Sequence, residues 1–233
     1  MSIYLRQLVA GRDFGRMNPV CGQMENLVYL IGDRTTRQCL VVDPAWGIDE
    51  IIAAAQGDDM TIVGALATHY HPDHVGGSMF GFTLEGATRL VSVNPCKVHC
   101  HSKELEGLRK VTGLEASDVV AHDSGDKVRV GNVEVEWLHT PGHTPGSSCF
   151  RVGNALVAGD TLFLQGCGRV DLPGGDSDEM YTTLTQRLAG LPGDMVLYPG
   201  HSYGGYLATL HEVRRSNPYM KVRDLQAWRR MRG

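Results

Sequence analysis

Short apolar runs of strand length, each bounded by turn-forming residues, recur along the chain. Three pairs of runs flank a short turn and predict β-hairpins. The pairs are Asn26–Ile31 with Gln38–Val42, Lys127–Val130 with Val133–Leu138, and Ser147–Val152 with Ala155–Ala158. Single strands are predicted at Thr61–Thr68 and Met195–Tyr198, and Leu90–Val93 and Lys97–Cys100 are weaker apolar pieces. Strands therefore dominate two long stretches of the chain.

Helical spacing of apolar residues interrupts these stretches in four places. The predicted helices are Asp49–Ala55, Lys103–Val111 on the surface, Asp178–Leu188 and Tyr206–Arg215. The third is amphipathic, with Met180, Leu184 and Leu188 on one side. The order is β-rich, helical, β-rich, helical, and no repeat or linker divides it. We therefore expect residues 1–233 to form a single α+β domain, a four-layer αββα sandwich.

Composition and charge narrow the class of protein. The 233 residues carry a formal net charge of −4 without a lysine- or arginine-rich block, so neither nucleic acid nor an anionic membrane is expected as a partner. Arg6 and Arg12 interrupt any apolar run of signal-peptide length near the start. No stretch of about 18 apolar residues could span a membrane. The scattered cysteines do not indicate a disulfide framework, and we expect a cytoplasmic protein.

One short segment carries most of the candidate chemistry. His69, His71, Asp73 and His74 lie within six residues, directly after the apolar run Thr61–Thr68. Imidazole nitrogens and carboxylate oxygens are the usual ligands of zinc and of non-haem iron. A single histidine at a strand end is more often a hydrogen-bonded surface residue, but four candidates in one tight loop favour a metal site.

Three further residues share this context, because each follows an apolar run at a turn, where functional groups commonly project from a scaffold. They are His143, Asp160 and His201. Seven ligands are enough for two metal ions. We expect the following arrangement: His69, His71 and His143 on one ion, Asp73, His74 and His201 on the other, and Asp160 bridging both.

The remaining histidines are interpreted as ordinary residues. His99 and His101 fit period-two alternation along a strand better than a second metal site, and His122 and His211 have no ligand context. His139 lies four residues before His143, so a supporting role near the site is conceivable.

With these residues assembled, the sequence resembles the metallo-β-lactamase superfamily, whose HxHxDH motif matches residues 69–74 in every position. Within it the chain is similar to glyoxalase II, the hydroxyacylglutathione hydrolases. The shared stretches are Gly159-Asp160-Thr161-Leu162-Phe163, Gly166-Cys167-Gly168-Arg169, Glu179-Met180 and Tyr198-Pro199-Gly200-His201-Ser202-Tyr203. Gly166–Arg169 also resembles the persulfide dioxygenases, which bind one iron through the residues that would be His69, His143 and Asp160. The resemblance implies the αββα fold reached above.

The resemblance implies hydrolysis of a thioester or related acyl compound, with two zinc ions as cofactors and iron possible. Asp73 would ligate one ion and orient the attacking hydroxide, and Asp43 would support the site without ligating. Arg169 is the candidate for binding a carboxylate of an anionic acyl thioester, with a structural ion pair as the alternative, and Tyr203 would line the same pocket. A persulfide dioxygenase, a lactonase or another hydrolase of this fold, and a non-catalytic metal-binding protein remain as rivals.

Overall fold

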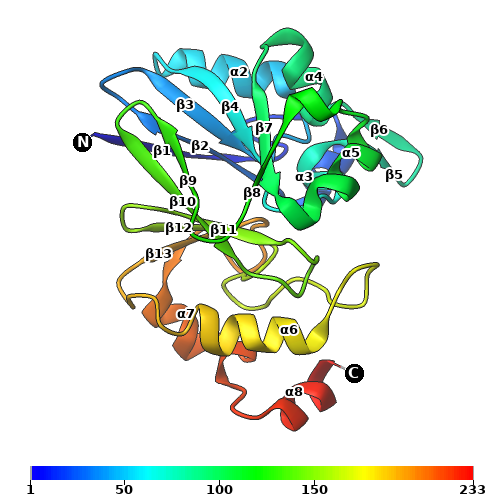
Figure 1. Cartoon of the computed structure of the whole chain (residues 1–233), viewed down its shortest axis with the longest axis vertical. Coiled ribbons are helices and arrows are strands. Elements are labelled where there is room, and N and C mark those ends of the chain that lie inside the picture. Colours follow the sequence, from blue (N-terminus) through cyan, green and yellow to red (C-terminus); the bar gives the residue numbers. More distant parts are fainter. Residues whose placement is uncertain (1, 233) are drawn as a thin grey trace.

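Two six-stranded sheets pack face to face, with helices on both outer surfaces (Figure 1). The structure is a computed structural model that describes residues 2–232, apart from the side chain of Pro19. None of the helices in this range combines the length and the apolar character needed to cross a membrane.

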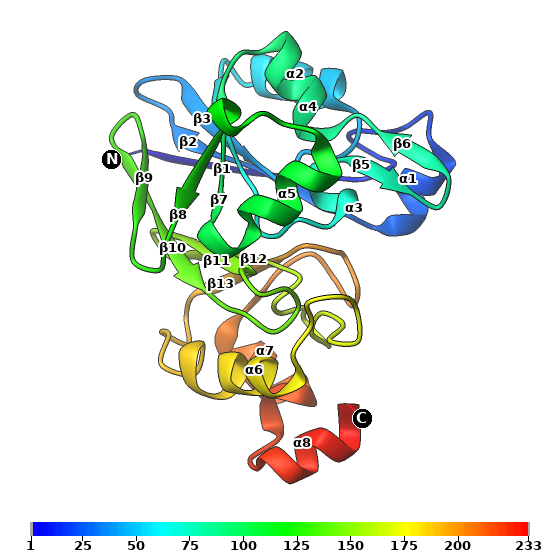
Figure 2. The ribbon, with the colours of Figure 1, turned by 45° about the vertical axis from the view of Figure 1, so that its right-hand side comes forward.

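The first sheet is formed by the N-terminal half of the chain. Its strands, in spatial order, are β1 (Ile3–Val9), β2 (Leu27–Asp33), β3 (Gln38–Val42), β4 (Thr61–Leu66), β7 (Lys97–His101) and β8 (Val119–His122). Pairing is antiparallel from β1 to β3 and parallel from β3 to β8. Its helices are α1 (Pro19–Met24), α2 (Ile48–Gly57), α3 (Pro72–Val75), α4 (Gly86–Val93) and α5 (Leu105–Thr112). A small hairpin of β5 (Gly77–Met79) and β6 (Phe82–Leu84) lies beside α1 (Figure 2).

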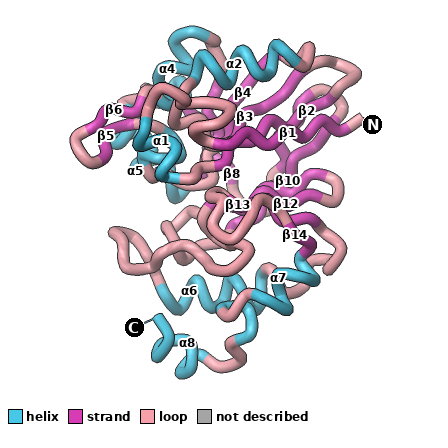
Figure 3. The backbone as a smooth tube through the Cα atoms, turned by 180° about the vertical axis from the view of Figure 1, so that it is seen from behind, coloured by secondary structure: helices cyan, strands magenta, loops and turns pink. Residues whose placement is uncertain are grey.

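The second sheet is formed by the C-terminal half. In spatial order its strands are β14 (Ala208–Thr209), β13 (Val196–Pro199), β12 (Ala155–Gly159), β11 (Ser148–Val152), β10 (Val133–His139) and β9 (Lys127–Val130). Only the β12–β13 pair is parallel among these pairings. Its outer face is covered by α6 (Ser177–Thr182), which continues as a π-helical turn (Thr183–Arg187), α7 (Leu210–Ser216) and α8 (Leu225–Arg232), as Figure 3 shows from behind.

Three apolar layers account for this architecture. Tyr29, Leu66 and Trp137 are buried between the two sheets, Ile51 and its neighbours fill the space under the helices of the first half, and Trp228 belongs to the layer under α6 and α7. Each sheet therefore buries both faces, which explains the near-continuous apolar runs in strands such as β2. The αββα sandwich predicted from the sequence is confirmed.

Some predicted segments differ from the structure in their bounds or type, and some elements, such as β1 and α8, were not predicted. The predicted helix Tyr206–Arg215 was wrong in its first turn, because Thr209 and Glu212 form a capping box and the helix begins at Leu210. The apolar piece Leu90–Val93 is the second half of α4 rather than a strand. The segment Asp178–Leu188 is helical with its apolar side buried, as predicted, but widens into the π turn after Thr182.

Candidate metal centre

The first half of the chain presents four of the candidate ligands from one loop. His69 follows β4, and His71 is the residue before the short helix α3. Pro72 occupies the first position of that helix, where a missing N–H costs nothing. Asp73 and His74 lie in the same single turn. The turn brings three imidazoles and one carboxylate, adjacent in sequence, to one end of the first sheet.

The second half supplies the rest from neighbouring strand ends. Because β12 and β13 run parallel, with Gly159 opposite Pro199, the residues that follow them, Asp160 and His201, emerge side by side. His143 comes from the loop between β10 and β11. Gly200 permits the close approach, since a Cβ at this position would lie 2.6 Å from Asp160 Oδ1.

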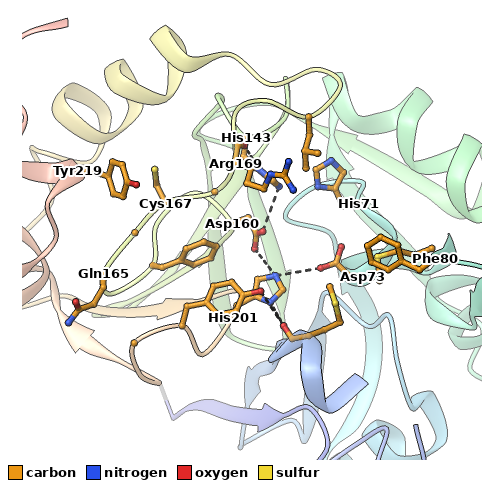
Figure 4. A pocket seen from close by; sticks show the side chains of 18 residues that line it. His71, Asp73, Phe80, His143, Asp160, Gln165, Cys167, Arg169, His201 and Tyr219 are labelled. Atoms are coloured by element: carbon orange, nitrogen blue, oxygen red, sulfur yellow. Dashed lines mark hydrogen bonds and ion pairs between the residues drawn. The ribbon is translucent and has the colours of Figure 1, made fainter. Parts of the chain in front are cut away.

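Six of the seven side chains form two clusters at the junction of the two sheets. Figure 4 shows His71, Asp73 and His201 together with His143 and Asp160 around the cavity. Ligand atoms of His69, His71 and His143 lie within 4.8 Å of one another, and so do those of Asp73, His74 and His201. In each cluster two Nε2 atoms are 3.2 Å apart, those of His69 and His143 and those of His74 and His201.

The other ring nitrogen of each of these four histidines is already engaged. Nδ1 of His143 donates to the carbonyl oxygen of Arg169 over 2.7 Å, and Nδ1 of His201 donates to the carbonyl oxygen of Met24 over 2.7 Å. A carbonyl accepts but cannot donate, so the proton is assigned to Nδ1 and the lone pair to Nε2.

The same argument holds on the side of the first sheet. Asp43 Oδ2 accepts from Nδ1 of His74 at 2.9 Å and from the hydroxyl of Thr68 at 2.7 Å. Since Thr68 has used its proton, it accepts from Nδ1 of His69, 3.0 Å away. Asp43 thus orients two histidines, the supporting role predicted for it, although it also lies near enough to them to form a third group of possible ligands. Four Nε2 lone pairs converge in facing pairs, a pattern that suits bound cations.

Asp160 lies between the clusters. Its Oδ1 is 3.2 Å from His74 Nε2 and 3.4 Å from His201 Nε2, while its Oδ2 is 3.7 Å from His143 Nε2. Oδ1 is buried and has no hydrogen-bond partner within the described residues. A buried carboxylate oxygen without a donor is costly, so this donor set fits bound metal ions.

The protonation of the two clusters differs. Burial lowers the pKa of His71 to about 4 and holds the pKa values of His69 and His143 below their usual value, so the first cluster is neutral at pH 7. Burial also acts to lower the pKa of His201, but the carboxylates of Asp160 and Asp73 outweigh it and raise the pKa to about 9. Without a cation, protons take the metal's place in the second cluster, so metal binding there displaces protons.

Glu104 is a functional residue that the sequence did not reveal. It is fully buried, although the sequence placed it on a surface helix. Its carboxylate accepts from Tyr70 N at 2.8 Å, from the Thr144 hydroxyl at 2.9 Å and from Gly146 N at 2.6 Å. Tyr70 separates two ligand histidines and Thr144 follows a third. Glu104 therefore ties together the two loops that supply the first cluster. An acidic residue just after a strand end near histidines was the one available signal.

Arg169 and Tyr203 both line the cavity above the clusters. The Arg169 guanidinium forms two hydrogen bonds with Asp171, of 3.0 and 2.7 Å, which corresponds to the ion-pair alternative. Tyr203 stacks on His201 with ring centroids 4.8 Å apart.

The other histidines stay outside both clusters. His99 pairs with His122 across β7 and β8, with 2.8 Å between ring nitrogens. His101 stacks on His139, whose Nε2 donates to the carbonyl oxygen of Pro145. His139 therefore touches the loop that carries His143 without facing the metal centre.

Known proteins are similar to this chain at moderate sequence identity. Human mitochondrial persulfide dioxygenase ETHE1 is 31% identical over 205 residues, 83% of this chain and 71% of that protein. The hydroxyacylglutathione hydrolase of a Polaromonas species is 36% identical over 182 residues, 76% of this chain and 62% of that protein. The crystal structure of ETHE1 from Myxococcus xanthus superposes with a TM-score of 0.73 at 30% identity, covering 92% of this chain and 83% of that one.

The family model described as the metallo-beta-lactamase superfamily matches residues 22–201, a span that begins before the first sheet's second strand and ends on the last candidate ligand. Together with the two-sheet fold and the histidine- and aspartate-lined metal centre, this match shows that the chain belongs to the metallo-beta-lactamase superfamily of metal-dependent enzymes.

Proposed function

We propose that the protein is a metal-dependent hydrolase that cleaves a small-molecule thioester with two metal ions. The observation that carries the proposal is the pair of complete clusters with the unpartnered Asp160 Oδ1 between them. A site for one ion would need only one of the clusters. Hydroxyacylglutathione hydrolase among the relatives supports the reaction class.

Two groups of residues would hold the ions. His69, His71 and His143 would bind one, Asp73, His74 and His201 the other, and Asp160 would contact both. Nitrogen and carboxylate donors suit zinc, or a mixture of zinc and iron. Such a metal pair lowers the pKa of water and polarises a carbonyl oxygen, so it supplies both nucleophile and electrophile.

The chain's own part is to fix charge and orientation. The Asp160 carboxylate would offset the repulsion between two bound cations. Asp73 is held by its backbone carbonyl, which accepts from Asn26 Nδ2 at 3.1 Å and from Trp46 Nε1 at 3.2 Å. Its side chain can therefore bind metal and orient the attacking oxygen. A thiolate leaves without protonation, so the reaction needs no general acid.

A mononuclear iron persulfide dioxygenase is the second candidate. The observation that favours it is the extent of the match, since the ETHE1 relatives align with 83% and 92% of this chain. This activity would use one iron held by His69, His143 and Asp160. Oxygen consumption with a persulfide substrate, measured beside metal content, separates the two candidates.

Asp160→Asn tests the two-metal hydrolase, because the amide keeps the shape and removes the charge. We expect metal content below two ions per chain and a thioesterase rate at least about 10²-fold lower, comparable to the loss of a major electrostatic element. His139→Ala, near the site but outside both clusters, is the matched control and should retain two ions. Elemental analysis and thioester hydrolysis are measured on the same preparations. Two ions and near-normal turnover in Asp160→Asn would refute the bridging role.

A further inference from the structure

The cavity above the metal centre has a polar floor and an apolar wall. Its volume is about 710 Å³, and the metal-binding side chains lie at its base. The wall comes from segments far apart in the sequence, including Met24 at the end of α1, Met79 and Phe80 in the β5–β6 hairpin, and Leu172 and Tyr219 from the second half. A substrate whose reacting carbonyl sits on the floor must place its remaining part against this wall.

The side chains of the wall provide little binding for a charged group of a substrate. Of the described residues that line the cavity, Arg169 alone carries a guanidinium or ammonium group. That group already forms a bidentate pair with Asp171, and both side chains are about two-thirds exposed. A substrate carboxylate would have to displace Asp171, and the pair presents no net charge.

Phe80 lines the cavity in a backbone conformation that is unfavourable for a bulky residue. It lies at the turn of the β5–β6 hairpin with φ 50°, followed by Gly81 with φ 80°, the backbone of a type I′ turn. Asparagine or glycine is usual at the first of these positions, and a bulky side chain with positive φ is strained. Phe80 is nevertheless 79% exposed and lines the cavity beside Asp73 (Figure 4).

We propose that this cavity selects thioesters with an uncharged, apolar acyl group, an aliphatic or aryl chain that lies along Phe80 and Leu172; the inference rests on the proposed hydrolase function. Water adds to the carbonyl carbon, the C–S bond breaks, and a carboxylic acid and a thiol are released, so no oxidant or reductant is needed. Phe80 determines specificity for the acyl chain, and Arg169 contributes little to binding.

The test uses metal-loaded protein and N-acetylcysteamine thioesters with acetyl, butanoyl, hexanoyl and octanoyl groups. Each methylene buried against the wall should raise kcat/KM by about fourfold until the wall is covered. Phe80→Ala should lower kcat/KM for the octanoyl substrate by about tenfold more than it lowers kcat/KM for the acetyl substrate. Phe80→Leu should retain most of the preference. Phe82→Ala is the matched control, since Phe82 is 47% exposed in the same hairpin and does not line the cavity.

Glutathione thioesters with the same acyl groups test the alternative that the protein recognises the charged thiol part of the substrate. A kcat/KM that is flat or falling with chain length would overturn the inference, and so would a preference of more than about tenfold for glutathione thioesters that Arg169→Ala abolishes. If no thioester is hydrolysed, the proposed function fails, and calorimetric titration with butyrate and octanoate decides the inference separately. Octanoate should bind at least about tenfold tighter than butyrate, and Phe80→Ala should remove the difference. Equal affinity of the parent protein for octanoate and butyrate would refute the inference.

Discussion

Replacing Glu104 with alanine removes the link between the two loops that supply the first metal cluster. The backbone N–H groups of Tyr70 and Gly146 lose their acceptor inside the protein, and each buried unpaired donor costs about 1–3 kcal/mol. The Thr144 hydroxyl keeps Ser147 Oγ, 2.7 Å away, as a partner. Burial raises the pKa of Glu104, so removing the carboxylate also recovers part of a desolvation cost. The net loss in the free energy of unfolding should be about 2–4 kcal/mol.

The loss of the Glu104 carboxylate should also weaken metal binding. Partners that orient metal ligands typically contribute 10–100-fold to metal affinity, so Glu104→Ala should weaken binding by about that factor. Glu104→Gln retains an amide oxygen as acceptor and should lose only about 1 kcal/mol. The matched control is Glu106→Ala, an exposed residue in the first turn of α5, two positions after Glu104, which should stay within about 0.5 kcal/mol of the parent protein.

Urea unfolding of the metal-free protein and competition with a chelator measure the two effects separately. The reasoning is refuted if Glu104→Ala unfolds like Glu106→Ala and binds metal within about threefold of the parent protein. That outcome would mean that the loops hold their geometry without the buried carboxylate.

Two further changes test neighbouring parts of the structure. Asp43→Asn leaves one fewer acceptor for the Thr68 hydroxyl and His74 Nδ1, so metal affinity should fall by about 10–100-fold in chelator competition; an unchanged affinity would show that the histidines are oriented without Asp43. Thr209→Ala removes the N-terminal cap of α7 and should cost about 1 kcal/mol, seen as a melting temperature about 2–4 °C lower by calorimetry, whereas Thr209→Ser should melt like the parent protein.

Local sequence patterns predicted the strands that carry strong apolar runs. The hairpin of β9 and β10 was found because Gly131-Asn132 separates two alternating segments. The strand β1 was missed because charged Arg6 and polar Gln7 interrupt its apolar residues, and both interact with distant elements that the sequence does not reveal. The helix α8 was also missed, since it is short and three arginines interrupt its apolar residues.

The metal centre was predictable to the extent that its residues share one motif or a recurring strand-end context. The segment His69–His74 could be recognised because four possible ligands lie within six residues. The structure brings His143, Asp160 and His201 close to this segment. Glu104 could not be found in this way, because its role depends on two loops, those of Tyr70 and Thr144, that lie 74 residues apart in the sequence and meet over one carboxylate. The pairing of Arg169 with Asp171 likewise depends on the conformation of one loop.

The distribution of the ligands over the two sheets has a consequence for how the molecule holds together. Each cluster takes residues from both halves of the sandwich, so an ion bound there is a cross-link between segments 74 residues apart (His69 and His143) or 128 residues apart (Asp73 and His201). Neither half alone presents a complete set. The free energy of unfolding therefore depends on the concentration of free metal as well as on the chain. Free metal at about one hundred times its dissociation constant adds about 2.7 kcal/mol to that free energy for each ion, and a chelator removes this contribution. The protein should separate along its inter-sheet seam most readily when metal is scarce.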